Sequence, residues 1–131
     1  MGDQPIAWIT GGGGLIGNYL VRAAPCLAPD WQARGLLRAH FDLTDFAAVT
    51  RAFQQDRPAF IVHCAGLTLS KECQANPAAA RVLNVDVTRH LTELAADIPL
   101  LFFSTDLVFN GRRGGYVESD PVNPLSVYGE T

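Results

Sequence analysis

A glycine-rich stretch near the N-terminus constrains the fold of this chain more than any other part of it. It reads Thr10-Gly11-Gly12-Gly13-Gly14-Leu15-Ile16-Gly17 and follows the apolar run Ile6–Ile9. Between a strand and a helix, Gly11 permits a tight turn, Gly14 lets backbone N–H groups approach a diphosphate, and Gly17 lets helix and strand pack closely. The amides of Leu15 and Ile16 then lie in the first helical turn, where the helix dipole favours an anion. The stretch therefore predicts a phosphate-binding turn.

Apolar runs of strand length alternate with longer amphipathic stretches along the rest of the chain, a pattern typical of βαβ units around a parallel sheet. Strands are predicted at residues 6–9, 35–38, 40–42 (a weak one), 60–64 and 100–103. Helices are predicted at residues 15–24, 44–55 and 76–96, with loop from residue 106 and a last helix that starts near residue 128 without room to form. The predicted fold class is α/β: a Rossmann-like, doubly wound parallel sheet of strand order 3-2-1-4-5, incomplete at the C-terminus, in one domain of residues 1–131.

The ends and faces of these helices have their own signals. Pro25 and Pro29 are expected to close the first helix, and Thr44 or Asp45 to cap the second. Asn76 followed by proline is a good start for the third. The residues expected on buried helix faces are Phe46, Val49, Phe53, Val82, Val85, Leu91 and Leu94.

The composition excludes several classes of function. A net charge of −3 and a pI of about 5.5 provide no basic surface for nucleic acid, and the scattered Lys and Arg form no membrane-binding patch. No apolar run reaches the roughly 20 residues that span a bilayer, and Asp3 stands where a secretory signal would carry positive charge. Cys26, Cys64 and Cys73 form neither a paired framework nor a metal-ligand spacing. We expect a cytoplasmic protein with free thiols and no metal site.

Four further segments place small or polar residues beside apolar ones. Phe41-Asp42-Leu43-Thr44-Asp45 precedes a predicted helix, His63-Cys64-Ala65-Gly66 ends a predicted strand, and Leu83-Asn84-Val85 lies within a helix. The fourth begins as Ser104-Thr105-Asp106-Leu107-Val108-Phe109-Asn110-Gly111 and leads to Tyr128-Gly129-Glu130-Thr131. Taken alone, the first segment is as consistent with an ordinary helix cap as with a binding role, and the third is as consistent with a structural asparagine as with a functional one. His63 is better explained as a hydrogen-bonded core histidine than as a catalytic group.

In this order, the segments resemble the extended short-chain dehydrogenase/reductase family, and within it the dTDP-4-dehydrorhamnose reductases (RmlD-like). In those reductases a strand ends in Ser-Thr-Asp and a Val-Phe-Asp-Gly turn follows; here Asn110 replaces that aspartate. The resemblance covers nearly the whole chain. It implies NAD(P)H-dependent reduction of a nucleotide-linked 4-keto sugar, with a nucleotide sugar as the substrate and a homo-oligomer as the expected assembly.

The resemblance also implies roles for individual residues. Asp42 and Leu43 would contact the adenine, and the segment from Cys64 to Gly66 would line the middle of the cofactor. Tyr128 would protonate the substrate oxygen, and Thr105 would donate a second hydrogen bond to it. The predicted cofactor-binding residues are Gly11, Gly14, Leu15, Ile16, Gly17, Arg38, Asp42, Leu43, Cys64, Ala65, Gly66, Asn84 and Tyr128.

Arg38 bears on the choice of cofactor. A carboxylate after the second strand usually binds the ribose 2′-hydroxyl of NAD, and none stands near residues 35–38. Arg38 could pair with the 2′-phosphate of NADP, or be a solvated surface arginine. We expect NADPH to be preferred, with NAD as an alternative cofactor.

In this family a lysine follows the catalytic tyrosine by four residues, and the sequence stops at Thr131, one position before it. We expect the chain to be part of a longer enzyme and to have little activity alone. The strand at residues 100–103, internal in a complete sheet, would then be an edge that promotes self-association.

Two other functions stay open. The regulatory subunit of methionine adenosyltransferase shares the His-Cys-Ala strand end and the Leu-Asn-Val-Asp helix, found here at residues 62–65 and 83–86. That would make the chain a non-catalytic NADP-binding subunit. A sugar-nucleotide epimerase or dehydratase is the third alternative, which Ser104-Thr105-Asp106 followed by Val-Phe fits less well. Lys71, Glu72 and Cys73 are expected in a loop, as solvated residues rather than substrate contacts.

Overall fold

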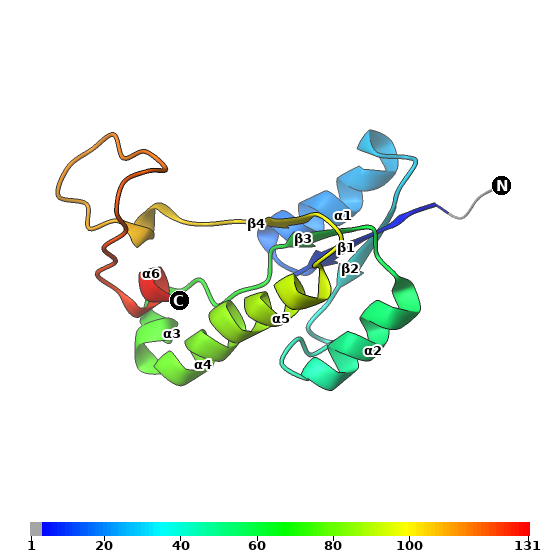
Figure 1. Ribbon diagram of the computed structural model, residues 1–131, viewed down its shortest axis with the longest axis horizontal. Coiled ribbons are helices and arrows are strands. Elements are labelled where there is room, and N and C mark those ends of the chain that lie inside the picture. The colour runs from blue at the N-terminus through cyan, green and yellow to red at the C-terminus, as the bar shows by residue number, and fades with distance from the viewer. Residues whose placement is uncertain (1–3) are drawn as a thin grey trace.

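Four parallel strands form a central sheet in the order β2-β1-β3-β4 (Figure 1). The strands are β1 Ile6–Thr10, β2 Gln32–Leu36, β3 Phe60–His63 and β4 Leu100–Phe102. The computed structural model describes residues 4–131, so Asp3 lies outside it. Because every pairing is parallel, the carboxyl ends of all four strands lie along one edge of the sheet. The α/β, Rossmann-like class is confirmed.

Helices cover both faces of this sheet: α1 lies on one face, and α2 and α5 lie on the other (Figure 1). The helical elements are α1 Leu15–Leu27, α2 Phe46–Asp56, α3 Ser70–Ala75, α4 Pro77–Arg81, the π-helical turn η1 Val82–Asp86, α5 Val87–Leu94, the 3₁₀ turn η2 Asp106–Val108 and α6 Val127–Glu130. None of the helices in residues 4–131 combines the length and apolar character needed to cross a membrane.

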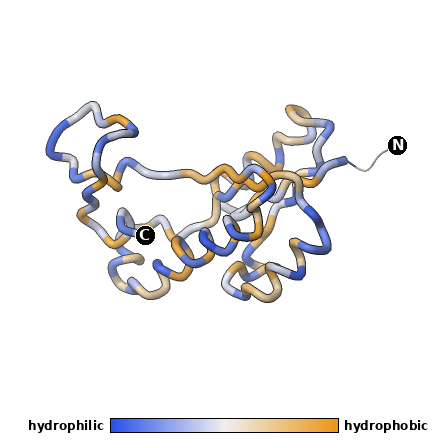
Figure 2. Tube along the Cα trace, viewed as in Figure 1, coloured by the Kyte–Doolittle hydropathy of each residue, from blue (hydrophilic) through white to orange (hydrophobic). Residues whose placement is uncertain are grey.

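The main core lies between the sheet and the helices α2 and α5, and hydrophobic and hydrophilic residues alternate along the trace of these two helices (Figure 2). Trp8 of β1 is its centre: the side chain is fully buried and meets the Phe53 ring edge-on at 5.6 Å. The Trp8 indole N–H donates to Asp56 at 2.8 Å. Apolar runs in β1 and β3 were sufficient to predict these inner strands because both of their faces are covered.

Two strand predictions are wrong, and the position of β2 explains the first. The predicted strand at 35–38 is shifted to Gln32–Leu36, since β2 is an edge strand that alternates polar and apolar residues. The weak strand at 40–42 does not form: the amides of His40 and Phe41 both donate to the Leu37 carbonyl, which closes a turn. The sheet therefore keeps the expected order without that outer strand.

The helix predictions need four corrections, of which the first three concern α1, α3 and α6. Helix α1 continues through Pro25 to Leu27, because only one backbone bond is lost near its end and the Ala28 amide still reaches the Ala24 carbonyl at 2.8 Å. Residues 70–75 form α3, with Cys73 fully buried and Lys71 exposed, where a loop was predicted. Near the C-terminus a short α6 does form, capped by the Ser126 hydroxyl.

The predicted single helix at 76–96 is interrupted. It begins as expected, with Asn76 capping α4 through a 3.1 Å bond from the Ala79 amide. The π-helical turn η1 then inserts extra backbone, which rotates the side chains that follow it around the helix axis. Val87 is consequently fully buried, whereas Val82, predicted on the buried side, is 36% exposed.

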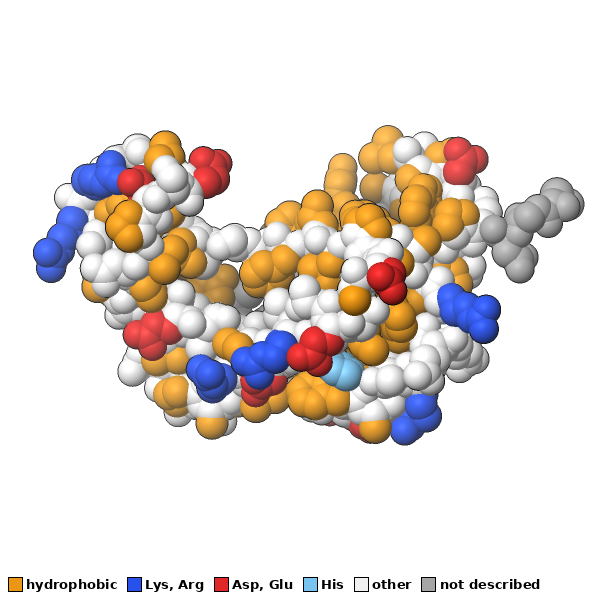
Figure 3. Space-filling view, viewed as in Figure 1, with side chains coloured by type: hydrophobic (Ala, Val, Ile, Leu, Met, Phe, Trp, Pro, Cys, Tyr) orange, Lys and Arg blue, Asp and Glu red, His pale blue; other side chains and the backbone are white. Residues whose placement is uncertain are grey.

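Residues 109–123 form a loop that projects away from the sheet, beyond α6 (Figure 1). The molecular surface is hollowed between this loop and the end of the sheet that carries α1 (Figure 3).

β4 lies at the edge of the sheet, as expected for this length of chain, and Leu101 and Phe102 are 43% and 50% exposed.

Candidate active site

The glycine stretch forms the predicted turn between β1 and α1. Gly11 has φ of 65°, and a Cβ placed on it would lie 2.8 Å from the Ala65 nitrogen, so the turn requires glycine. A Cβ on Gly17 would lie 2.3 Å from the Gly11 carbonyl oxygen, which shows how closely α1 packs on the loop. Helix α1 begins after Gly14 with no side-chain cap and no acidic residue in its first turn. Its N-terminal amides are therefore suited to an anion.

Two cavities lie along the carboxyl edge of the sheet, and they share Cys64, Ala65 and Gly66. The Asp42 cavity has a volume of about 570 Å³ and includes Gly11, Gly14, Arg38, Asp42 and Leu43 in its lining. The Tyr128 cavity has a volume of about 340 Å³ and includes Ile16, Asn84, Thr105 and Tyr128. The two cavities are therefore adjacent, and together they occupy the carboxyl edge of the sheet from Arg38 to Tyr128; we refer to the pair as the groove.

Two predicted cofactor residues line neither cavity. The Leu15 side chain is 92% exposed and lies outside the groove. Gly17 is buried in the packing of α1 against the glycine loop. Any part they have in binding an anion is through their backbone amides in the first turn of α1.

Polar groups at one end of the groove are held by short local bonds. One oxygen of Asp42 accepts from both the amide and the hydroxyl of Thr44, at 2.9 and 2.7 Å. These bonds, with a smaller contribution from the charge of Arg38, hold the pKa of Asp42 below its usual value. The second Asp42 oxygen is therefore an ionised acceptor for a donor in the groove. Asp45, not Thr44, caps α2, through a 2.9 Å bond from the Ala48 amide.

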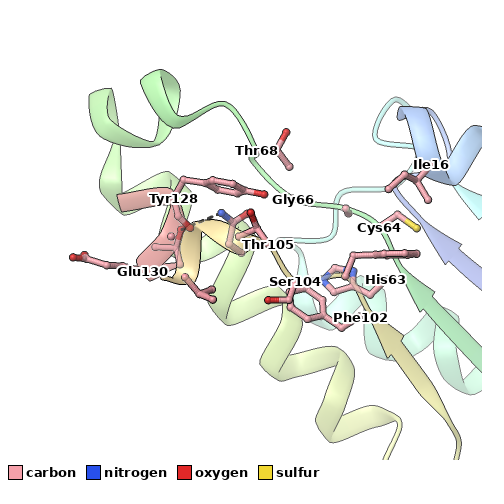
Figure 4. A pocket seen from close by; sticks show the side chains of 16 residues that line it. Ile16, His63, Cys64, Gly66, Thr68, Phe102, Ser104, Thr105, Tyr128 and Glu130 are labelled. Carbon is pink, nitrogen blue, oxygen red and sulfur yellow. Dashed lines mark hydrogen bonds between the residues drawn. The ribbon is translucent and has the colours of Figure 1, made fainter. Parts of the chain in front are cut away.

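The other end of the groove holds Thr105 and Tyr128, which Figure 4 shows facing the same cavity from η2 and α6. Both side chains are partly buried. Thr105 caps η2, accepting from the Leu107 amide at 3.3 Å. A Cβ on Gly129 would lie 2.3 Å from the Leu107 carbonyl oxygen, so this glycine lets α6 approach η2 and keeps Tyr128 next to Thr105. The structure thus brings together the two predicted catalytic residues, which are separated by the 109–123 loop.

Thr10 holds the segment that both cavities share. Its side chain is fully buried, and its hydroxyl oxygen accepts from the amides of Cys64 and Ala65, each at 3.1 Å. This turns the chain at the end of β3 alongside Gly11. Burial raises the pKa of the Cys64 thiol, which stays protonated at neutral pH and is a poor nucleophile.

His63 is a buried histidine with both ring nitrogens hydrogen-bonded. It is 1% exposed; Nδ1 lies 2.6 Å from the Thr10 hydroxyl and Nε2 lies 3.0 Å from the Thr88 hydroxyl. Burial lowers its pKa from 6.5 to about 4. A ring that is neutral at pH 7 and bonded on both sides fits the expectation of a core histidine.

Asn84 connects the groove wall to α6. Its Oδ1 accepts from the Leu67 amide at 2.7 Å, and its Nδ2 donates to the Leu67 carbonyl at 3.0 Å and to the Thr131 hydroxyl at 3.1 Å. Thr131 in turn donates to the Val127 carbonyl of α6 at 2.9 Å. Asn84 therefore has a structural function as well as a place in the lining of the Tyr128 cavity.

Sequence reasoning missed several residues on which the site depends. Gly12 and Gly35 are in close contact: a Cβ on Gly12 would lie 2.9 Å from the Gly35 Cα, where the loop crosses β2. The glycine at 35 follows an exposed arginine in the edge strand, and that alternation was the available signal. No local signal indicated that Gly129 packs against Leu107 or that the Thr10 hydroxyl accepts from the amides of Cys64 and Ala65, because these partners lie far away in the sequence.

The strand order, the glycine turn before α1, and the joint placement of Thr105 and Tyr128 define a Rossmann-fold protein of the extended short-chain dehydrogenase/reductase class. A family model described as the RmlD substrate binding domain matches residues 7–131. The match covers nearly the whole chain, and the chain belongs to this family.

Named relatives agree with this assignment. A dTDP-4-dehydrorhamnose reductase from Streptomyces griseus is 39% identical over 131 residues, covering 98% of this chain and 42% of the relative. The methionine adenosyltransferase 2 subunit beta of Danio rerio is 35% identical over 130 residues, covering 94% of this chain and 40% of the relative. The crystal structure of a Bacillus anthracis dTDP-4-dehydrorhamnose reductase in complex with NADP superposes with a TM-score of 0.90 at 28% identity, covering 99% of this chain and 47% of that one. The chain thus spans less than half the length of each of these proteins.

Proposed function

We propose that this chain is the cofactor-binding and proton-donating part of an NADPH-dependent reductase that acts on a nucleotide-linked 4-keto sugar, as a dTDP-4-dehydrorhamnose reductase does. The observation that carries the proposal is the groove itself. It runs along the carboxyl edge of a parallel sheet, where ligands of such folds bind, and it passes the uncapped end of α1 between Arg38 and Tyr128.

The residues present fit a nicotinamide dinucleotide. Gly11 leaves a cradle that a Cβ would fill, next to first-turn amides that suit a diphosphate. Asp42 and Leu43 would hold the adenine, and Arg38 would pair with the 2′-phosphate of NADP. Cys64, Ala65 and Gly66 would line the middle of the cofactor, with Ile16 and Asn84 beside its far half. NAD would bind in the same groove without the phosphate contact.

The chemistry of the Tyr128 cavity follows from its two hydroxyl groups. When bound, the reduced nicotinamide supplies hydride to the ketone carbon of the sugar. Tyr128 donates its phenolic proton to the ketone oxygen as negative charge develops there, and Thr105 donates a hydrogen bond that holds the oxygen in place. The apolar rings of Phe102 and Phe103 also line the cavity.

Two measurements test this proposal in order. The 131-residue chain is titrated with NADP⁺ and NAD⁺ by calorimetry, and we expect saturable binding with NADP⁺ the tighter ligand. A protein that contains the chain is then assayed for NADPH oxidation with a dTDP-4-keto-6-deoxy sugar. Tyr128→Phe should lower kcat by about 10²–10⁴ while NADPH still binds. Absence of dinucleotide binding to the wild-type chain refutes the cofactor site, and full activity of Tyr128→Phe refutes the role of the tyrosine.

A second function is a non-catalytic, NADP-binding regulatory subunit. The similarity to a methionine adenosyltransferase 2 subunit beta over 94% of this chain favours it specifically. The presence of Tyr128 and Thr105 does not separate the two functions, whereas turnover of a keto-sugar nucleotide does.

A cytoplasmic location and a homo-oligomeric assembly complete the proposal. The free thiols of Cys26, Cys64 and Cys73 are consistent with a reducing compartment.

A further inference from the structure

Hydrogen bonds between two buried side chains, Thr10 and His63, and the partly buried Thr88 link the glycine-loop end of β1 to the π-helical turn. The Thr10 hydroxyl oxygen has two lone pairs, and both are occupied by the amides of Cys64 and Ala65 at 3.1 Å. Its proton is therefore directed to the third neighbour, Nδ1 of His63, at 2.6 Å. This arrangement makes Nδ1 an acceptor, which assigns the ring proton of neutral His63 to Nε2.

The remaining bonds then have one direction. His63 Nε2–H donates to the Thr88 hydroxyl oxygen at 3.0 Å, and the Thr88 hydroxyl donates to the backbone carbonyl of Asn84 at 2.6 Å. The π-helical turn η1 puts Asn84 at its centre, and the Asn84 carboxamide holds Leu67 by two bonds and Thr131 by a third. Thr131 is bonded to the first turn of α6, which carries Tyr128.

We propose that Thr10, His63 and Thr88 are positioning residues that fix the shared wall of the groove relative to the helix of Tyr128. The series of hydrogen bonds from Thr10 through His63 and Thr88 to the Asn84 carbonyl is called the relay below. The proposal rests on the proposed function, because it makes the relay necessary for the placement of the cofactor against the proton donor. One end of the relay fixes the amides of Cys64 and Ala65, where Gly11 packs against the wall. The other end fixes the turn from which Asn84 reaches Leu67 and α6.

The relay depends on a neutral His63. A ring protonated on both nitrogens would direct an N–H at Thr10, whose lone pairs are already used, so the first bond would break. The groups packed around the ring are Thr10 from β1, Phe102 from β4 and Thr88 from α5, with the Cys64 thiol next in the chain. None of these four groups carries a charge at neutral pH, so none of them favours an imidazolium.

The first test is spectroscopic and independent of the proposed function. The ¹⁵N chemical shifts and two-bond couplings of the His63 ring, measured in the 131-residue chain between pH 6 and 8, should show the neutral form with the proton on Nε2. A proton on Nδ1, or a mixture of tautomers, overturns the direction of the relay.

The second test uses a matched pair of threonines on α5. Thr88→Val removes the acceptor of His63 and the donor to Asn84 with little change in shape, and Thr88→Ser restores both. Thr92→Val is the control, because the Thr92 hydroxyl also donates to a carbonyl one helical turn away, but the residue is exposed and is not hydrogen-bonded to His63. In Thr88→Val we expect the Leu67 amide to exchange about tenfold faster and the Kd for NADP⁺ to rise about tenfold. Thr88→Ser and Thr92→Val should stay close to wild type.

The outcomes separate the two proposals. If Thr88→Val folds, protects Leu67 and binds NADP⁺ as tightly as Thr92→Val, the threonine is only a packing residue and the relay has no positioning role. If the wild-type chain binds no NADP⁺, the proposed function fails, while the His63 tautomer and Leu67 exchange still decide whether the relay exists.

Discussion

Substituting Gly17 by alanine tests whether the close packing of α1 on the glycine loop creates the anion site. The added Cβ would lie 2.3 Å from the Gly11 oxygen, 2.7 Å from the Gly11 carbonyl carbon and 3.1 Å from the Gly12 Cα. All three are backbone atoms that no rotamer change can move. Since ordinary contacts begin at 3.4 Å, loop and helix must separate by about 1 Å at this point.

The energetic consequence has two opposing parts. Overpacking of this kind costs about 1–3 kcal/mol, whereas alanine is about 1 kcal/mol better than glycine inside a helix. The free energy of unfolding should therefore fall by up to about 2 kcal/mol. The movement also displaces the first-turn amides of α1 relative to Gly11 and Gly14, so they no longer converge on one anion. The Kd for NADP⁺ should therefore rise at least about tenfold.

Gly13→Ala is the matched control in the same loop. The nearest atom to a Cβ on Gly13 is Leu37 Cδ2 at 3.6 Å, an ordinary contact, and Gly13 lies outside the left-handed region that requires glycine. Urea denaturation gives the stability of each variant, and calorimetry at a temperature where both are folded gives the NADP⁺ affinity. If Gly17→Ala matches Gly13→Ala in both measurements, the close packing at Gly17 does not shape the site.

Three further predictions concern other parts of the molecule. Burial lowers the pKa of His63 to about 4, so between pH 6.5 and 4 the unfolded chain binds a proton that the folded chain does not. The free energy of unfolding should therefore fall by about 3 kcal/mol as the pH drops through this window, and less in His63→Gln, by urea denaturation at several pH values. Arg38→Ala should raise the calorimetric Kd for NADP⁺ about tenfold and leave that for NAD⁺ unchanged, with a smaller effect at high salt; equal NADP⁺ affinities in the variant and its parent would remove the role of Arg38. The isolated chain should self-associate through the unpaired, apolar edge of β4, and Leu101→Lys should reduce this association; sedimentation of the wild-type chain as a clean monomer would contradict it.

The parts of the fold that the sequence predicts are those whose signals are local. β1 and β3 are short apolar runs because both of their faces are covered, and Gly11 and Gly17 after β1 are necessary because a Cβ on either would clash with backbone atoms. The caps Asp45 and Asn76 are readable for the same reason, since each bonds an amide three residues ahead. These features were enough to predict the class of fold and the glycine turn that lies at the groove.

Edges and interruptions were not predictable in the same way. β2 was predicted at residues 35–38 instead of Gln32–Leu36, because its exposed residues alternate with apolar ones and form no continuous apolar run. The π-helical turn in Val82–Asp86 leaves an apolar helical pattern intact while it changes which face is buried. Helix α3 is a single short stretch with one buried side chain, Cys73, too short to have a clear period.

The groove contains both residues that local sequence patterns can identify and residues that they cannot. Each of its parts follows a strand or opens a helix, and parallel strands end at the same edge of the sheet, so the sequence can name the residues that meet there. What holds these parts at fixed distances is a different set of bonds, Thr10 to His63 across 53 positions and His63 to Thr88 across 25. Threonine and histidine at such separations have no recognisable spacing. The residues that would touch the cofactor can therefore be predicted from motifs, whereas those that would hold it against Tyr128 require the three-dimensional structure.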